Sequence, residues 1–83
     1  MIETMIYRKA LGDKIGSMGH DPEAVFKYLA QEYSELRKHG HHTSGQRKAL
    51  REIRHEYIES LNGSTQKEEI RKLMRKYPVQ FTD

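Results

Sequence analysis

The sequence predicts an all-α fold, a small bundle of three to four short helices arranged as stacked helical hairpins. Two observations carry this prediction. Apolar residues recur at intervals of three and four along most of the chain. Capping residues and turn glycines separate these periodic segments from one another. The length of 83 residues leaves room for a single helical domain, residues 1–83, with one core.

The segment from Asp21 to Gly40 has the most complete helix pattern. Asp21 suits the N-cap and Pro22 the first helical position, while Gly40 suits a left-handed C-cap. The apolar residues between them share one face: Val25, Phe26, Leu29, Tyr33 and Leu36. Basic residues fill the last turn, where the helix dipole favours them: Arg37, Lys38 and His39. We interpret this helix as scaffold that supplies the core.

Two more helices follow, joined by the turn Asn62-Gly63-Ser64. Thr43 with Gln46 fits a capping box at the start of the first, and Thr65 with Glu68 repeats it at the start of the second. The two helices present these apolar stripes: Leu50, Ile53, Tyr57 and Leu61, then Ile70, Leu73, Met74 and Tyr77. Pro78 ends the last helix and leaves a short tail, 78–83, whose Phe81 is a candidate to fold back onto the core.

The N-terminal segment is less regular. Ile2, Met5, Ile6 and Ala10 predict a helix over about residues 2–11, with a short strand through Met5-Ile6-Tyr7 as the alternative. Three glycines then break the pattern, at positions 12, 16 and 19. We therefore expect a flexible connection over about residues 12–20.

Composition excludes several classes of protein. There are no cysteines, so the chain has neither disulfides nor thiolate metal sites. No apolar stretch approaches the roughly 18 residues that a membrane span requires, and the first residues do not resemble a signal peptide. We therefore expect a cytoplasmic protein without membrane contact. The lean composition, with 35% hydrophobic and 33% charged residues, also leaves room for a protein partner or a homodimer that completes the core.

Charge divides the chain into a neutral part and a basic part. Residues 43–83 carry nine Lys and Arg against six Asp and Glu, whereas the first 42 residues carry six of each. On a helical wheel, the helix from Ser44 to Leu61 places its basic residues on one flank of the apolar stripe and Glu52, Glu56 and Glu59 on the other. Such sorting puts like charges side by side, which costs a few tenths of a kcal/mol per pair. Either neighbouring helices carry complementary charges, or the basic flank binds a partner.

The sorted charges point to a small non-enzymatic binding or regulatory protein that engages nucleic acid through a basic helical face. The contacts would be to the phosphate backbone or to structured RNA. The candidate residues lie on the last two helices: Arg47, Lys48, Arg51, Arg54, Arg71, Lys72, Arg75 and Lys76. A DNA-reading helix-turn-helix is not indicated, because aligning its turn glycine with Gly63 puts polar residues at most of the motif's buried positions.

A protein-binding adaptor or inhibitor, of the phage-encoded or host-regulatory type, is the alternative function. Aromatic residues dominate the energetic centres of protein interfaces, and the two-signed surface would supply the charged rim. The candidate residues for that surface are Tyr28, Glu52, Glu56, Tyr57, Glu59 and Phe81.

Cofactors, metals and catalysis find little support in the sequence. His39, His41 and His42 are close together, but no cysteine or positioned carboxylate completes a four-ligand site, so we expect no metal. His55 lies one turn from Glu52 and Glu59, and catalysis would require another titratable group to converge with it in a cleft. We expect no enzymatic activity, no cofactor and no small-molecule substrate.

Overall fold

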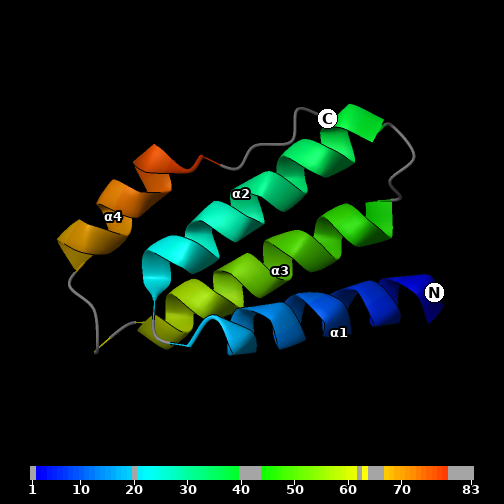
Figure 1. Ribbon diagram of the computed structural model, residues 1–83, viewed down its shortest axis with the longest axis horizontal. Helices are drawn as coiled ribbons and strands as arrows, with labels where there is room; N and C mark the ends of the chain where they lie inside the picture. The colour runs from blue at the N-terminus through cyan, green and yellow to red at the C-terminus, as the bar shows by residue number, and fades with distance from the viewer. Residues whose placement is uncertain (1, 20, 40–43, 62, 64–66, 79–83) are drawn as a thin grey trace.

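The computed structural model describes residues 2–19, 21–39, 44–61, 63 and 67–78, and within these it contains four α-helices and no strand. They are α1 (Ile2–Ser17), α2 (Pro22–His39), α3 (Ser44–Leu61) and α4 (Lys67–Lys76). Figure 1 shows α1 and α3 running in the same direction, with α2 antiparallel to both and α4 on the far side of α2 from α1. The all-α prediction is confirmed.

The first helix is longer than predicted, and the strand alternative through Met5-Ile6-Tyr7 is wrong. α1 continues to Ser17, so the connection to α2 is shorter than the expected flexible segment 12–20. Leu11 is buried, and Ile15 and Met18 pack against the same core, so burial of this face outweighs the poor helix propensity of glycine.

The connection between α1 and α2 begins with a tightened last turn. The Met18 amide donates to the Ile15 carbonyl at 3.1 Å and the Gly19 amide to that of Gly16 at 3.3 Å. Gly19 has φ +65°, a left-handed conformation in which a side chain would be strained.

The predicted start of α2 is confirmed. The Ala24 amide donates to Asp21 Oδ1 at 3.3 Å, and the Val25 amide donates to the Asp21 carbonyl at 3.2 Å. Asp21 is therefore the N-cap, and Pro22 occupies the first helical position.

Several other predicted caps lie outside the described residues, namely Gly40, Thr43, Asn62 and Thr65, as does Phe81 in the tail. Gly63 is described and has φ +101°, which suits the predicted turn. α4 ends at Lys76, and the Tyr77 amide makes a last bond to the Leu73 carbonyl at 2.9 Å before Pro78. The predicted stop at Pro78 is thus confirmed.

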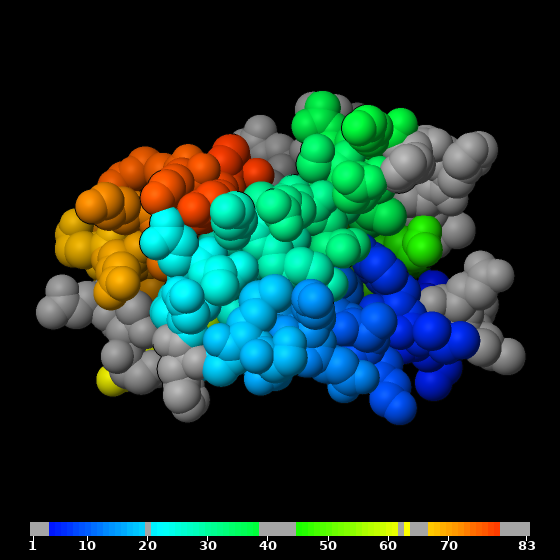
Figure 2. All heavy atoms as spheres, viewed as in Figure 1, coloured from blue at the N-terminus to red at the C-terminus, as the bar shows by residue number. Residues whose placement is uncertain are grey.

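Two hydrophobic clusters hold the helices together, and α2 contributes to both. Leu11, Val25, Leu29, Tyr33 and Leu50 join α1, α2 and α3, and Phe26, Leu61, Ile70 and Leu73 hold α4 against α2 and α3. The predicted stripes of the later helices supply all of these residues except Leu11, although Met74 remains 37% exposed. In α1 the prediction was wrong, because Met5, Ile6 and Ala10 are exposed and Leu11 is buried instead. Figure 2 shows α1, α2 and α4 covering most of the near face, with α3 behind them. Within the described residues, no helix combines the length and the apolar character that crossing a membrane requires.

Candidate nucleic-acid interface

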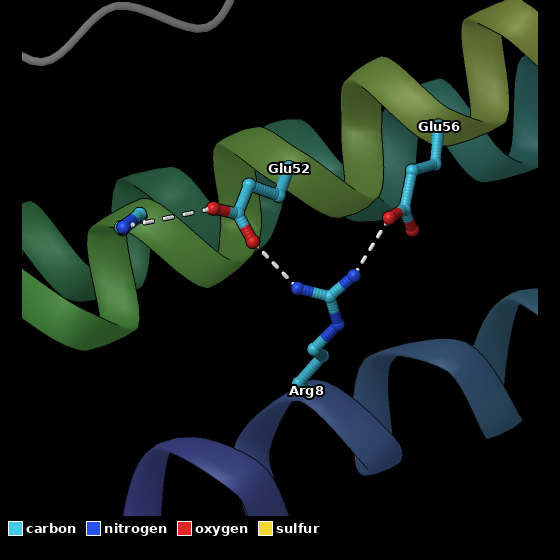
Figure 3. A network of polar contacts seen from close by, with 4 residues as sticks. Arg8, Glu52 and Glu56 are labelled. Atoms are coloured by element: carbon cyan, nitrogen blue, oxygen red, sulfur yellow. Dashed lines mark hydrogen bonds and ion pairs between the residues drawn. The ribbon is translucent and has the colours of Figure 1, made fainter. Parts of the chain in front are cut away.

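Two residues of the acidic flank of α3 pair with a cation of α1 at the surface of the bundle. Figure 3 shows Arg8 reaching from α1 to two carboxylates that are one turn apart on α3. Arg8 Nη1 lies 2.5 Å from Glu52 Oε2, and Arg8 Nη2 lies 2.6 Å from Glu56 Oε1. The hydrogen bond to Glu52, followed by the charge of Glu56, raises the pKa of Arg8 above its usual value. A neighbouring helix therefore explains half of the charge sorting.

Two residues of the basic flank of α3, Arg51 and Arg54, lie on the α2 side instead. Arg54 is half-buried, and its guanidinium carbon lies 5.8 Å from the centre of the Phe26 ring, within range of a cation–π contact. Burial lowers the pKa of Arg54, although the neighbouring Tyr33 opposes this shift. Burial in turn raises the pKa of Tyr33, and the positive charges of Arg54 and Arg51 oppose that shift. Arg51 and Arg54 thus lie close to Tyr33.

Tyr33 also lines a groove of about 380 Å³ along the second half of α2. It is lined by Ala30, Tyr33, Ser34, Arg37, Lys38 and Pro78. Tyr33 lines this groove and also lies near Arg51 and Arg54, so cations of both α2 and α3 lie near it. We call Arg37, Lys38, Arg51 and Arg54 the Tyr33 cluster.

Half of this cluster was not predicted from the sequence. In the sequence the helix dipole is sufficient to explain Arg37 and Lys38 in the last turn of α2, which gives no sign of a binding role. A usable signal was present, because Arg37 follows Tyr33 by four residues and so lies on the same side of the helix.

The eight predicted basic residues do not form one patch. Arg51 and Arg54 belong to the Tyr33 cluster, and Arg47 is partly buried at the start of α3. Lys48 lies on the α1 side, where its Nζ is 4.0 Å from Glu52 Oε1 and it lines a groove with Arg8.

The basic residues of α4 lie beside carboxylates. Lys76 Nζ donates to Glu23 Oε1 at 2.6 Å, and the Tyr77 hydroxyl donates to the same oxygen at 3.0 Å. Carboxylates and cations share a groove between α4 and the start of α2, lined by Glu23, Glu68, Glu69, Lys72, Leu73, Arg75 and Lys76. Arg71 is exposed on α4. The helix thus presents a surface of mixed charge.

Most residues of the predicted protein-binding surface contact other parts of the same chain. Tyr57 packs edge-on against Phe26, with ring centres 6.1 Å apart, and Tyr28 packs against the first hydrophobic cluster. Glu52 and Glu56 bind Arg8, and Glu59 lies on the exposed side of α3. The exposed large apolar residues of the described chain are instead Met5, Ile6 and Met74.

His55 is the one histidine whose side chain the structure describes. His55 and Glu59 are both exposed, with His55 Nε2 3.8 Å from Glu59 Oε1. His20, His41 and His42 lie outside the described residues, as does the side chain of His39. Among the residues described, no three His, Asp or Glu side chains converge closely enough to hold a metal ion.

The chain matches no protein-family model, no curated protein and no solved structure.

Proposed function

We propose that the chain binds nucleic acid through backbone phosphates, using the Tyr33 cluster. The observation that carries the proposal is the separation of charge on α3. Glu52 and Glu56 are paired with Arg8 on the α1 side, while Arg51 and Arg54 lie near Tyr33 of α2, which lines a groove with Arg37 and Lys38. An anion that approaches the α2 side meets cations from two helices.

The side chains of the cluster suit a polyanion. Arginine offers a rigid fork of donors that matches phosphate oxygens, and the exposed Ser34 is a polar residue of the groove lining. The groove is lined by residues of α2 and by Pro78, so it follows one helix. Such a surface favours contact with a backbone over recognition of individual bases.

The salt dependence of binding tests the proposal. If four cations neutralise phosphates of a duplex, affinity falls by roughly a hundredfold between about 50 and 200 mM NaCl. Fluorescence anisotropy with a labelled DNA duplex, a DNA single strand and an RNA hairpin measures this fall and ranks the three ligands. Absence of binding to all three at low salt would overturn the proposal.

A matched pair of variants locates the surface. The double variant Arg37→Gln/Arg51→Gln removes two charges from the Tyr33 cluster, and Lys14→Gln/Lys27→Gln removes two exposed charges elsewhere. The first should lower the affinity at least tenfold. It should also make the slope of log affinity against log salt concentration shallower by about two, because two phosphate contacts are lost. The second should have a smaller effect on both, and equal effects would assign binding to net charge alone.

The protein adaptor remains the alternative, and a pull-down from lysate separates the two functions. Material that is released by nuclease supports the nucleic-acid proposal. A specific protein retained after nuclease, together with no binding to the three labelled ligands, would support an adaptor.

A further inference from the structure

α1 presents an unpartnered apolar surface on the side that faces away from the core. Its inward side contributes Leu11, and Ile15 packs against the same cluster. On the outward side Met5 is 71% exposed and Ile6 is 63% exposed, the two largest exposures among the large apolar residues described. Figure 2 shows α1 uncovered along the lower edge of the near face.

Two glycines share the outward side of this helix. A Cβ built on Gly12 or on Gly16 would meet no atom within 4 Å, so no contact within the described structure requires a glycine at either position. Each glycine costs a helix interior up to about 1 kcal/mol relative to alanine. Glycines on a helix face allow a second helix to approach closely.

The outward stripe is self-complementary when two copies run antiparallel. At about 100° per residue, Ile6, Lys9, Asp13 and Gly16 fall along one narrow stripe of α1. If Lys9 of one copy lies level with Asp13 of the other, two-fold symmetry repeats the pair, and Ile6 comes level with Gly16 at both ends. Large residues then face small ones, and opposite charges face each other.

The charges of this stripe are available for such pairing. Lys9 and Asp13 are both exposed, and neither makes an ion pair with another residue in the described part of the chain. We propose that a second copy of the chain packs its α1 antiparallel against this stripe and forms a two-fold symmetric dimer, in which Lys9 of each copy pairs with Asp13 of the other.

An apolar groove beside Met5 enlarges the proposed interface toward α3. It has a volume of about 440 Å³ and includes Thr4, Met5 and Ala49 between the charged side chains of Arg8 and Lys48. One helix face together with this groove buries less surface than the roughly 800 Å² per partner of a standard stable interface. We therefore expect a weak dimer, which forms at micromolar or higher concentrations.

Complementary charge reversals test the register. The variant Lys9→Asp would place two acidic residues opposite each other, and Asp13→Lys would place two basic residues opposite each other. Like charges in an interface oppose association, so each variant alone should raise the dimer Kd by about tenfold or more. An equimolar mixture of the two should associate as a heterodimer, because both acidic residues of the first variant then face lysines of the second.

Sedimentation equilibrium of the full chain gives the result directly. The apparent mass of the wild type should rise from 9.8 kDa toward twice that value as the protein concentration rises. Ile6→Glu should keep the chain monomeric, whereas Met74→Glu, at the exposed apolar residue of α4, should not affect association. Circular dichroism verifies that each variant is folded.

Three outcomes would overturn the proposal. They are a wild type that stays monomeric at millimolar concentration, a dimer that neither charge reversal weakens, and a mixture of the two variants that fails to associate. None of them depends on nucleic-acid binding, so the dimer and the proposed function stand or fail separately.

Discussion

Arg8 on α1 lies 2.5 Å from Glu52 on α3, although 44 residues separate the two in the sequence. Arg8 also binds Glu56, so a single cation joins two carboxylates that repel each other on the same helix. The pairing holds Glu52 and Glu56 on the α1 side of α3, whereas Arg51 and Arg54 lie near Tyr33 of α2. The relationship therefore connects the packing of the bundle to the surface that we propose for nucleic acid.

Reversing the charge of Arg8 should destabilise the bundle. Arg8→Glu would place three carboxylates together at the junction of α1 and α3, so the melting temperature should fall. The double variant Arg8→Glu/Glu52→Arg restores one opposite pair and should recover part of the loss. Thermal denaturation followed by circular dichroism measures both changes, and a double variant no more stable than Arg8→Glu would contradict this role.

Local sequence signals predicted most of the fold, because each depends on neighbouring residues. The Asp21 cap, the stop at Pro78 and the apolar stripe of α2 all appear where the pattern placed them. The extension of α1 through Gly12 was missed because it depends on burial of Ile15 against other helices, which spacing alone does not reveal.

The candidate site was less predictable for a related reason. The basic flank of α3 follows from the helical period, but its neighbours depend on how the helices pack. Arg37 joins Arg51 beside Tyr33 only in the folded chain, and the pairing of Glu52 with Arg8 is equally non-local. The charge sorting could be predicted from the sequence, whereas the element that compensates it could not.

Alanine at the outward glycines of α1 should stabilise the monomer. Gly12→Ala and Gly16→Ala should each raise the free energy of unfolding by about 0.5–1 kcal/mol, because the helix gains propensity and the added methyl group meets no neighbour. Gly19→Ala should instead lower it by about 1–2 kcal/mol, since φ there is +65°. Urea denaturation at low protein concentration, where the monomer prevails, measures all three. Destabilisation by Gly12→Ala would indicate that α1 does not extend through this position.

Acid should weaken the attachment of α4 to α2. The hydrogen bond from Lys76, and then that from Tyr77, lowers the pKa of Glu23 below its ordinary value of 4.5. A lowered folded-state pKa contributes stability that is present above pH 4.5 and lost as the pH falls through the folded-state value. Glu23→Gln should remove this part of the acid dependence in denaturation curves between neutral and acidic pH. Because the contact is exposed, high salt should also reduce it, and an unchanged acid profile in Glu23→Gln would contradict the assignment.

Alkali should weaken the contact between α1 and α2. The Tyr7 hydroxyl donates to Glu32 Oε2 at 3.1 Å. Burial, and then the negative charge of Glu32, raises the pKa of Tyr7 above its ordinary value of 10.0 and that of Tyr28 to about 12. Stability that depends on a raised pKa is fully present below pH 10 and is lost as the pH rises through the folded-state values. The free energy of unfolding should therefore fall above pH 10.

The variant Tyr7→Phe isolates the contribution of this hydroxyl. It should cost about 1 kcal/mol at neutral pH, because it removes one hydrogen bond and leaves Glu32 without that donor. It should also make the loss of stability above pH 10 less steep, since phenylalanine has no hydroxyl to titrate and one tyrosine with a raised pKa is removed. Urea denaturation at several alkaline pH values, combined with tyrosinate absorbance, measures both effects. A variant with the same alkaline slope as the wild type would show that Tyr7 does not couple α1 to α2 in this way.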